Sequence, residues 1–403
     1  MDRTMRFIGI GLGFIALIIM YLDRTALSYA IQPLETTFHL NNADFGLISS
    51  AFGFGFIIMI IIGGVLADHH GARKIWSLFA IMWSVACILL GSAIGFYSLF
   101  IYRLLLGAAE APGFPCYMRV IVDWFPQRQR TRAFALASSA VAFSSVVGAP
   151  LTTHLIVRFN WRITFYILGA LGIIWALVWY TFYRDNLKKA LPPKKITWKF
   201  LLFTPTLLAN QTAFFVFSYV QFFALVWLPG YLLQIYHLPL TQVGLFLIVP
   251  WLTAGVFLIL GGILSDILLT KTQSLRISRS YLILVCQLLS GICFIIVLIK
   301  PSLTSALIFM SLGLGFNNMP TSSMGIINAD LAEARASSSL GVMNFAFGVA
   351  SIISPVITGF MSTWTGNFNS AIFLMVILIF ISILTVFFFH KPKSIGTNPI
   401  SRS

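Results

Sequence analysis

Four ionisable side chains stand inside apolar stretches of the sequence, where a charge is costly. Asp23 and Arg24 follow the apolar run "FIGIGLGFIALIIM" (7–20), and Arg103 and Glu110 lie in a second apolar stretch. Each such residue costs about 2.5–3.5 kcal/mol at the centre of a membrane helix, so it must pair or face water. The four charges sum to zero if both acids are ionised.

The spacing of these residues indicates how they are arranged. Arg103 and Glu110 are two helical turns apart on one face, about 10 Å along the axis. Asp23 and Arg24 are adjacent, so their side chains point about 100° apart and cannot neutralise each other. We therefore expect both helices to present charge to a shared space.

A neutral cluster of this kind can exchange partners. An incoming anion can take an arginine, and a proton can neutralise the carboxylate that is released. Burial disfavours the charged form of a carboxyl group, so buried acids can bind and release protons near neutral pH. The alternative is a static salt-bridge network that locks two helices together. Intramembrane ionisable residues are functional by default, so we favour the exchange.

The composition describes the elements that hold these groups. Of 403 residues, 59% are hydrophobic and 9% charged, against about 25% charged in a soluble domain. Continuous apolar stretches of ~20 residues recur, each long enough to span a bilayer as a helix. The fold class is therefore an all-α polytopic membrane protein, not a β-barrel. We expect spans at roughly 7–31, 44–67, 75–94, 97–121, 132–156, 163–183, 206–235, 242–265, 281–299, 304–327, 338–361 and 368–389.

The net charge of +15 reflects topology. An even number of spans puts both termini on one side, and most of the Lys and Arg residues fall there. Arg158, Arg162 and Lys300 fall on the other side. The positive-inside rule makes both termini cytoplasmic, and we expect the bacterial inner membrane. Membrane lipid is the partner that this charge fits; no groove-like segment of basic and aromatic residues indicates nucleic acid.

The polar stretch "YRDNLKKALPPKKITWK" (183–199) divides the spans six and six. We predict an N-terminal six-helix bundle (1–183), a cytoplasmic linker (184–205) and a C-terminal six-helix bundle with a short tail (206–403). "GGVLAD" (63–68) and "GGILSD" (261–266) end the second helix of each half. Repeated six-helix halves are typical of a transporter with its site at the membrane midplane.

Prolines interrupt the helix that carries Glu110. In "GAAEAPGFP" (107–115), Pro112 and Pro115 free backbone groups beside a carboxylate. Such breaks occur where a helix lines a cavity or where neighbours satisfy the backbone. The same sequence is also compatible with a simple packing kink.

The second half carries neutral polar groups inside its spans. Asn317 and Asn318 stand beside Pro320, and Asn344 lies on a glycine-rich face. Buried amides need partners, so these residues either line a substrate cavity or bond neighbouring helices, with equal weight.

The turn "GGVLADHHGARK" (63–74) has the character of a gate. Asp68 can cap the next helix or pair with a cation from a neighbouring loop. We interpret it as a latch, with His69 and His70 solvated. The four cysteines lie inside spans and show no metal-binding or disulfide spacing, so no metal site is expected.

This turn resembles the G-x-L-x-D-x-x-G-x-[RK]-[RK] motif of the major facilitator superfamily. Gly64, Leu66, Asp68, Gly71, Arg73 and Lys74 carry it, with a shift of one position at Ala72. The resemblance covers nearly the whole chain. The stretches "YLDRTALS", "RLLLGAAEAPGFP", "WFPQRQRTRA", "NWR" and "WLPGYL" are similar to the anion:cation symporter branch, which includes sialin and bacterial hexuronate and galactonate permeases.

The resemblance implies proton-coupled uptake of an organic anion through inward-open and outward-open states. It implies that Asp23 and Glu110 form the protonation pair, that Arg24 anchors the substrate carboxylate and that Arg103 links the acids to the site. Gly64, Asp68, Gly71 and Arg73 would then belong to the gate. The energy would come from the proton gradient without a cofactor, and we expect a monomer.

One departure from the family bears on the substrate. The family usually has tryptophan, tyrosine, glutamine and proline where this chain has Phe54, Phe56, Ile60 and Ile62. Fewer groups are then available to bind hydroxyls. We expect an anion less hydroxylated than a sugar acid, such as an aromatic acid, a di- or tricarboxylate or a carboxylate siderophore, with Phe56, Asn317, Asn318 and Asn344 among its contacts.

Other function classes make different demands on the sequence. A proton-coupled antiporter that exports a drug, siderophore or metabolite could use the same cluster, because direction is not encoded in these residues. An intramembrane enzyme would need a Ser–His pair, paired aspartates or an H-E-x-x-H motif facing inward. A sensor would need a soluble output domain. Neither pattern is present, so we predict that the chain is not an enzyme.

Overall fold

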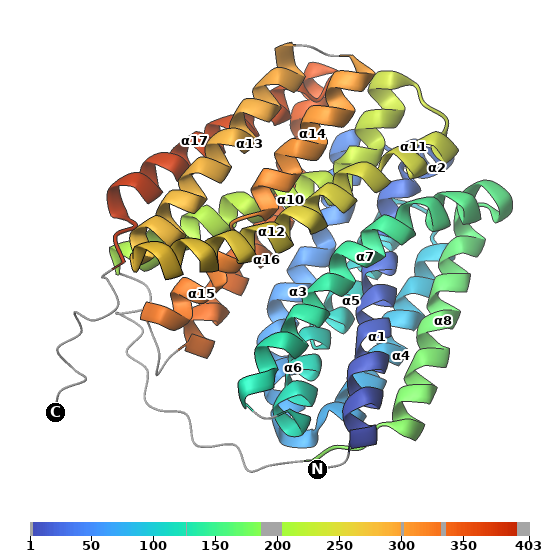
Figure 1. Ribbon diagram of the computed structural model, residues 1–403. Coiled ribbons are helices and arrows are strands. Elements are labelled where there is room, and N and C mark those ends of the chain that lie inside the picture. The colour runs from blue at the N-terminus through green and yellow to red at the C-terminus, as the bar shows by residue number, and fades with distance from the viewer. Residues whose placement is uncertain (1–2, 126, 187–203, 300–301, 332–335, 393–403) are drawn as a thin grey trace. The chain divides into compact units, whose positions relative to one another are not determined.

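A computed structural model describes residues 3–125, 127–186, 204–299, 302–331 and 336–392 (Figure 1). The described chain is helical throughout. Its first part contains α1 (Arg3–Tyr29), α2 (Ile31–Phe38), α3 (Asn42–His70), α4 (Ala72–Gly91), α5 (Phe96–Glu110), α6 (Gly113–Trp124), α7 (Gln127–Phe159) and α8 (Trp161–Phe182). The second part contains α10 (Pro205–Tyr236), α11 (Leu240–Phe246), α12 (Ile248–Thr272), the π-helical turn η1 (Arg276–Tyr281), α13 (Leu282–Ile299), α14 (Leu303–Asn318), α15 (Thr321–Leu331), α16 (Ala336–Thr365) and α17 (Asn369–Phe389).

Twelve spans follow from these helices. Ten helical stretches of the described chain are long and apolar enough to cross a membrane alone. Two further crossings are each made of two shorter helices, α5 with α6 and α14 with α15. The chain turns between their members at Ala111–Pro112 and Met319–Pro320, because a proline removes a backbone donor and clashes with the preceding turn. The predicted all-α polytopic class and the predicted break beside Glu110 are confirmed.

The outer faces of the helices are those of a membrane protein. Ile61 in α3, Leu177 in α8 and Phe389 in α17 expose 71%, 59% and 55% of their surface. Soluble monomers rarely expose large contiguous apolar patches, whereas hydrocarbon accepts them. The chain is therefore an integral membrane protein.

The described residues form two compact units. Unit 1 comprises the described residues within 1–192, 223–248 and 351–366, and unit 2 comprises those within 193–222, 249–350 and 367–403. The division by contacts thus assigns the ends of α10 and α16 to unit 1. The six-and-six division of the sequence stays a prediction, and most of the predicted linker (187–203) lies outside the described residues.

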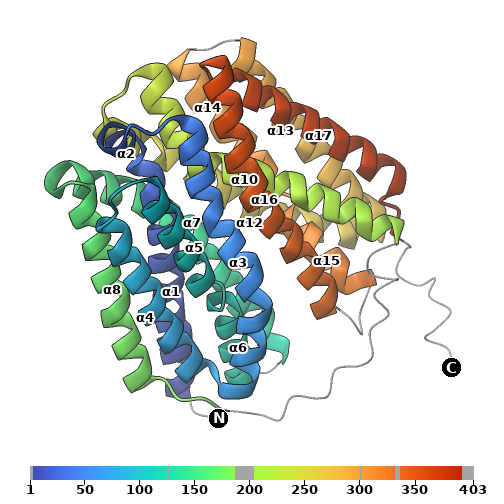
Figure 2. The same ribbon diagram turned by 180° about the vertical axis from the view of Figure 1, so that it is seen from behind.

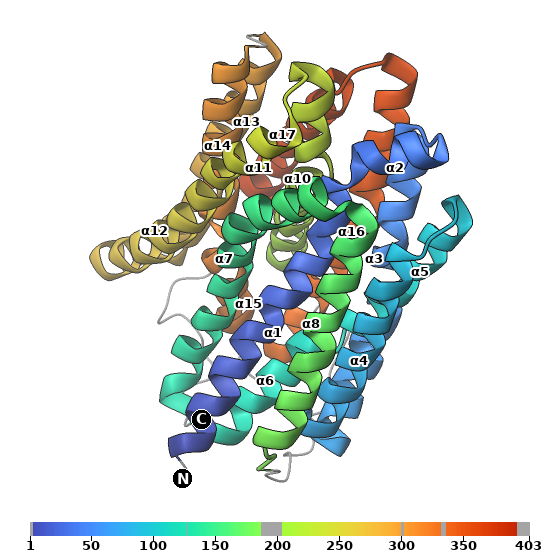
Figure 3. The same ribbon diagram turned by 90° about the vertical axis from the view of Figure 1, so that its right-hand side faces the viewer.

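Unit 1 is built from long helices that lie side by side. α4 packs along α8, α3 along α5, and α1 along α7 (Figures 2 and 3). The approach of α3 to α5 depends on glycine. A Cβ atom added to Gly55 would lie 2.7 Å from the backbone nitrogen of Ala108, so only a residue without a side chain fits. Small residues at helix contacts are typical of membrane proteins.

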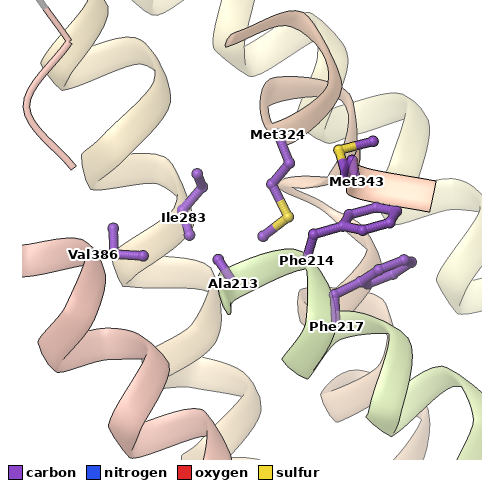
Figure 4. Packing of buried hydrophobic residues seen from close by; sticks show 7 residues of the cluster. All are labelled: Ala213, Phe214, Phe217, Ile283, Met324, Met343 and Val386. Atoms are coloured by element: carbon purple, nitrogen blue, oxygen red, sulfur yellow. The ribbon is translucent and has the colours of Figure 1, made fainter. Parts of the chain in front are cut away.

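Unit 2 has its own apolar core, which Figure 4 shows from close by. Five helices, α10, α13, α15, α16 and α17, supply its side chains. The buried cluster consists of Ala213, Phe214, Phe217, Ile283, Met324, Met343 and Val386. Outside this cluster, α13 also packs along α14, and it packs along α17.

The internal repeat seen in the sequence reappears as matching contacts. A Cβ atom on Gly63 of α3 would lie 2.5 Å from Pro112, at the break between α5 and α6. A Cβ atom on Gly261 of α12 would lie 2.6 Å from the carbonyl carbon of Met319, at the break between α14 and α15. Each repeated glycine therefore packs against the broken helix of its own unit.

Candidate functional site

The intramembrane charges gather in unit 1. Arg24 of α1 donates from Nε and Nη2 to Oε2 of Glu110, at 3.3 and 3.0 Å. Glu110 is the last residue of α5, directly before the proline break, so its position along the axis is fixed by the end of the helix. The pair joins α1 to α5.

The other two charged residues complete the cluster. Arg103 lies two turns before Glu110 on the same face of α5 and donates from Nη1 to the backbone carbonyl of Arg24 at 3.4 Å. Asp23 points away from Arg24, and Cys87 of α4 donates its thiol proton to Oδ1 of Asp23 at 3.7 Å. Adjacent residues on α1 thus reach different helices, as the 100° rotation per residue requires.

Aromatic rings surround the Arg24 guanidinium. Its central carbon lies 4.6 Å from the ring centre of Tyr21, 4.5 Å from Phe52 and 5.4 Å from Phe56. Phe52 and Phe56 are one turn apart on α3 and stack at 5.8 Å. Arg103 also lies over Phe52, at 5.2 Å. Ring faces attract a cation, and more strongly where water is excluded. They hold the cation in place without neutralising it.

The cluster is buried but its hydrogen bonding is incomplete. Asp23 and Glu110 have no exposed surface, Arg103 exposes 3% and Arg24 exposes 7%. Among the described residues, Oε1 of Glu110, Oδ2 of Asp23 and Nε of Arg103 have no hydrogen-bond partner. An unsatisfied buried polar atom calls for an explanation such as a catalytic or binding role.

Of the four positions that depart from the family pattern, Phe56 is the one at the cluster. It is buried and contacts both Phe52 and Arg24. Phe54 and Ile62 expose nearly half of their surface, and Ile60 is half-buried.

The predicted gate residues occupy one end of unit 1. Asp68 has a mostly exposed side chain and pairs with Arg119 of α6 at 3.5 Å. It does not cap α4. The cap is Asp185, after α8, whose Oδ1 accepts from the backbone nitrogen of Arg73 at 3.0 Å. Burial raises the pKa of the Asp185 carboxyl, and the backbone donors of Arg73 and Ala72 oppose that rise.

Two glycines of the same turn have different roles. Gly71 has φ 83° and ψ 156°, a region that is essentially restricted to glycine, and Asp185 fills the space where a side chain would lie. Gly64 lies within α3, and a Cβ atom there would be 3.9 Å from Pro115. Arg73 donates from Nε to the carbonyl of Tyr180 at 2.9 Å and lies over its ring.

The asparagines predicted in the second half lie in unit 2. Asn317 donates to the carbonyl of Phe217 at 3.1 Å. Asn318 donates to Oε1 of Gln221, also at 3.1 Å. Both bonds join α14 to α10, and the substrate-cavity role that the sequence also left open stays a prediction. The side chain of Asn344 on α16 is exposed.

The sequence did not indicate several residues of these sites. Cys87, one of the four cysteines for which the sequence indicated no site, contacts Asp23. Asp185, placed in the linker, caps α4. Tyr21 and Phe52 contact Arg24. Their positions in the sequence could have indicated this, because residues three or four positions apart share a helix face, as Tyr21 does with Arg24 and Phe52 with Phe56.

Comparisons with known proteins agree with this architecture. The family model described as Major Facilitator Superfamily matches residues 13–275 and 268–403. The hexuronate transporter of Bacillus subtilis (strain 168) is 29% identical over 96% of this chain and 97% of its own. The probable galactarate/D-glucarate transporter of the same organism is 30% identical over 89% and 86%.

A solved structure shares the fold. A bacterial homolog of the human lysosomal transporter Spinster, in an inward-facing and occupied conformation, superposes with a TM-score of 0.84. It covers 96% of this chain and 97% of its own, at 18% identity. The matched relatives are transporters and not enzymes. The chain therefore belongs to the Major Facilitator Superfamily.

Proposed function

We propose that the chain imports an organic anion together with protons by rocker-switch alternating access. Asp23 and Glu110 bind the protons, Arg24 binds the substrate carboxylate, and Arg103 links the acids to the substrate. We further propose a monomer in the bacterial inner membrane with both termini cytoplasmic.

One observation carries this proposal: only one of the two carboxylate oxygens of Glu110 is bonded to Arg24. Glu110 engages Arg24 through Oε2 alone, while Oε1 has no partner among the described residues. A proton on Glu110 removes the charge that holds Arg24. The arginine is then available to a substrate carboxylate, with which it forms charge-assisted hydrogen bonds. Proton and anion enter together, so the net charge of the cluster is conserved.

Arg103 gives the exchange its second cation. Because it donates to the carbonyl of Arg24, it stays beside the site when Glu110 loses its partner. Asp23, held by a weak thiol donor, provides a second acid within the same group of helices. Both carboxyl groups are inaccessible to solvent here, so they load and unload in other states of the cycle.

The rings around Arg24 favour an anion with an apolar part next to its carboxylate. Phe52 and Phe56 offer stacked faces and no hydrogen-bonding groups. The two Bacillus subtilis relatives are named for sugar acids, which are rich in hydroxyl groups. We propose that this chain takes a carboxylate less hydroxylated than those substrates, with Asn317, Asn318 and Asn344 as further candidate contacts.

The first experiment identifies the substrate. Purified protein is heated with hexuronates, aldarates, aromatic carboxylates and tricarboxylates at two pH values. A ligand that binds only the folded state raises the unfolding temperature. We expect the largest shift from an aromatic or weakly hydroxylated carboxylate, and a larger shift at acidic pH.

The second experiment tests the coupling. In proteoliposomes, Glu110→Gln should abolish accumulation driven by a proton gradient and preserve counterflow exchange, because the neutral amide mimics the protonated acid. Asp44→Asn, which neutralises an acid at the start of α3, should accumulate substrate normally. Unchanged accumulation by Glu110→Gln would exclude Glu110 as a coupling site. Imposing the gradient in the opposite direction separates an importer from an exporter.

A further inference from the structure

The short helix α2 lies at the end of unit 1 remote from the N-terminus (Figure 1), and it carries one member of a second group of polar side chains. Glu35 of α2, Asn42 of α3 and Gln234 of α10 form it. Gln234 donates from Nε2 to Glu35 Oε1 at 3.2 Å and to Asn42 Oδ1 at 3.1 Å, and Asn42 Nδ2 donates to Gln234 Oε1 at 3.2 Å. We call these three residues the amide–carboxylate latch.

The latch lies where four helices meet closely. The backbone nitrogen of Ala43, next to Asn42, donates to Oγ1 of Thr363 in α16 at 2.9 Å. A Cβ atom on Gly359 of α16 would lie 2.5 Å from the carbonyl oxygen of Asn42. The ends of α10 and α16 are therefore bound to α2 and α3 through tight contacts within one compact unit.

Glu35 is the one acid of the latch and it is only half-buried. Burial raises the pKa of its carboxyl to about 7, and donation from Gln234 opposes the rise. Other titratable or charged groups stand on the elements packed around α2, namely Tyr29 on α1, His39 after α2, Asp44 on α3, Arg162 on α8, and Tyr231, Tyr236 and His237 at the end of α10. The Arg162 guanidinium donates hydrogen bonds to the backbone carbonyls of Gly91 and Ala93.

We propose that Glu35 is a further proton-binding site, separate from Asp23 and Glu110, and that a proton on Glu35 favours the closed latch. The inference rests on the proposed proton-coupled function and extends it. With the N-terminus cytoplasmic, the latch lies on the outer side of the membrane, where a symporter takes up its protons.

The direction follows from linkage. An open latch exposes Glu35 to water, where a glutamate has its ordinary pKa. The closed latch holds the same carboxyl at a raised pKa, so closure takes up a proton. Protonation of Glu35 makes its full contribution to the free energy of latch closure below the ordinary pKa of glutamate. This contribution is lost as the pH rises through the raised pKa of about 7. Between pH 5 and 8 the closed-to-open ratio should fall roughly tenfold or more, a figure discounted for the partial exposure of Glu35.

The test measures the latch directly and requires no substrate. Spin labels are attached at Thr37→Cys on α2 and Thr241→Cys on α11, both exposed; the four native cysteines are buried. Electron–electron double resonance then gives the distance distribution of the full-length protein in lipid nanodiscs at pH 5 to 8, without organic anion. We expect a short-distance population at pH 5 that declines as the pH rises.

Variants assign the response to Glu35. Glu35→Gln should keep the short distance at every pH, whereas Asp44→Asn should behave like the parent. An Asp23→Asn/Glu110→Gln background should retain the response. A pH-dependent distance that survives in Glu35→Gln, or one that disappears in the Asp23→Asn/Glu110→Gln background, would overturn the proposal.

The result is independent of the transport assay. If Glu110→Gln still accumulates substrate, the proposed coupling fails while the distance measurement stands. If the distances do not depend on pH, the latch proposal fails while the coupling at Glu110 stands.

Discussion

Arg24 makes three kinds of contact, and only one of them depends on the charge of Glu110. The ion pair to Glu110 is lost when that acid binds a proton. The contacts with Tyr21, Phe52 and Phe56 persist, because they depend on the arginine's own charge. The bond from Arg103 to the Arg24 carbonyl is also unaffected. In the proposed exchange, Arg24 would stay in position while its carboxylate partner changes, and so would be pre-organised for substrate.

This predicts that lysine cannot replace arginine at position 24. Lysine keeps the charge but loses the planar donor fork and the ring stacking. Arg24→Lys should weaken binding of the best anion by about 10- to 100-fold, the equivalent of roughly 1.4–3 kcal/mol. Titration calorimetry on the purified protein measures this.

Arg162→Lys is a matched control, because Arg162 also stacks on a ring, that of Trp161 at 4.3 Å, but outside the cluster. The Arg162→Lys variant should bind the anion with the same affinity as the parent protein. Equal affinity in Arg24→Lys and in Arg24→Ala would show that another residue anchors the anion.

The sequence predicted which residues form the cluster but not how they pair. Charge in an apolar stretch is costly, so Asp23, Arg24, Arg103 and Glu110 stood out. Helical spacing put Arg103 and Glu110 on one face. The choice of Arg24 as the partner of Glu110 depends on the rotation of α1 relative to α5, and packing sets that rotation. The roles of these residues remain predictions until transport is measured.

At the scale of elements, the turn between α3 and α4 depends on one glycine. Gly71→Ala should lower stability by about 1–3 kcal/mol, because an alanine is strained at this φ and ψ. Its Cβ atom would also displace Asp185 from the start of α4. Thermal unfolding in detergent measures the loss.

Gly64→Ala tests the same motif at a position inside a helix. Its Cβ atom meets only ordinary contacts, and alanine is a better helix former than glycine. Its unfolding temperature should equal or exceed that of the parent. Equal unfolding temperatures for Gly71→Ala and the parent would refute the geometric role of Gly71.

Helix breaks were predictable and short helices were not. Pro112 and Pro320 end α5 and α14 for reasons contained in the chain itself. α2 has eight residues and α11 seven, and isolated helices so short are unstable in water. Contacts such as Gln234 with Glu35 and Gly244 with Thr153 hold them. No local pattern encodes such contacts.

At the scale of the whole molecule, charge predicts orientation. A membrane-impermeant maleimide applied to intact cells should label Thr37→Cys, on α2, and leave Thr270→Cys, at the end of α12, unlabelled. Inside-out vesicles should give the reverse, because the positive-inside rule predicts that the basic loops face the cytoplasm. Both residues are exposed, so access depends on sidedness alone. Labelling of Thr270→Cys in intact cells would invert the topology.

The division into two units could not have been predicted from the polar linker. Contacts assign 223–248 and 351–366 to the same unit as the first eight helices, although they belong to the second half of the sequence. Which helix ends touch depends on the conformation that the chain adopts. Hydropathy and charge predict the membrane spans and their topology. These two features are the same in every conformation of the chain, so they cannot predict which helix ends touch.

The matched glycine contacts, Gly63 on Pro112 and Gly261 on Met319, have an evolutionary consequence. When a glycine contact at a helix break is present twice, one copy of the repeat can diverge in sequence while the other keeps its ionisable residues. Here every described buried carboxyl side chain lies in unit 1. Exchanging the second half of the chain between homologues should therefore change which substrate is transported and leave the dependence of transport on the proton gradient unchanged.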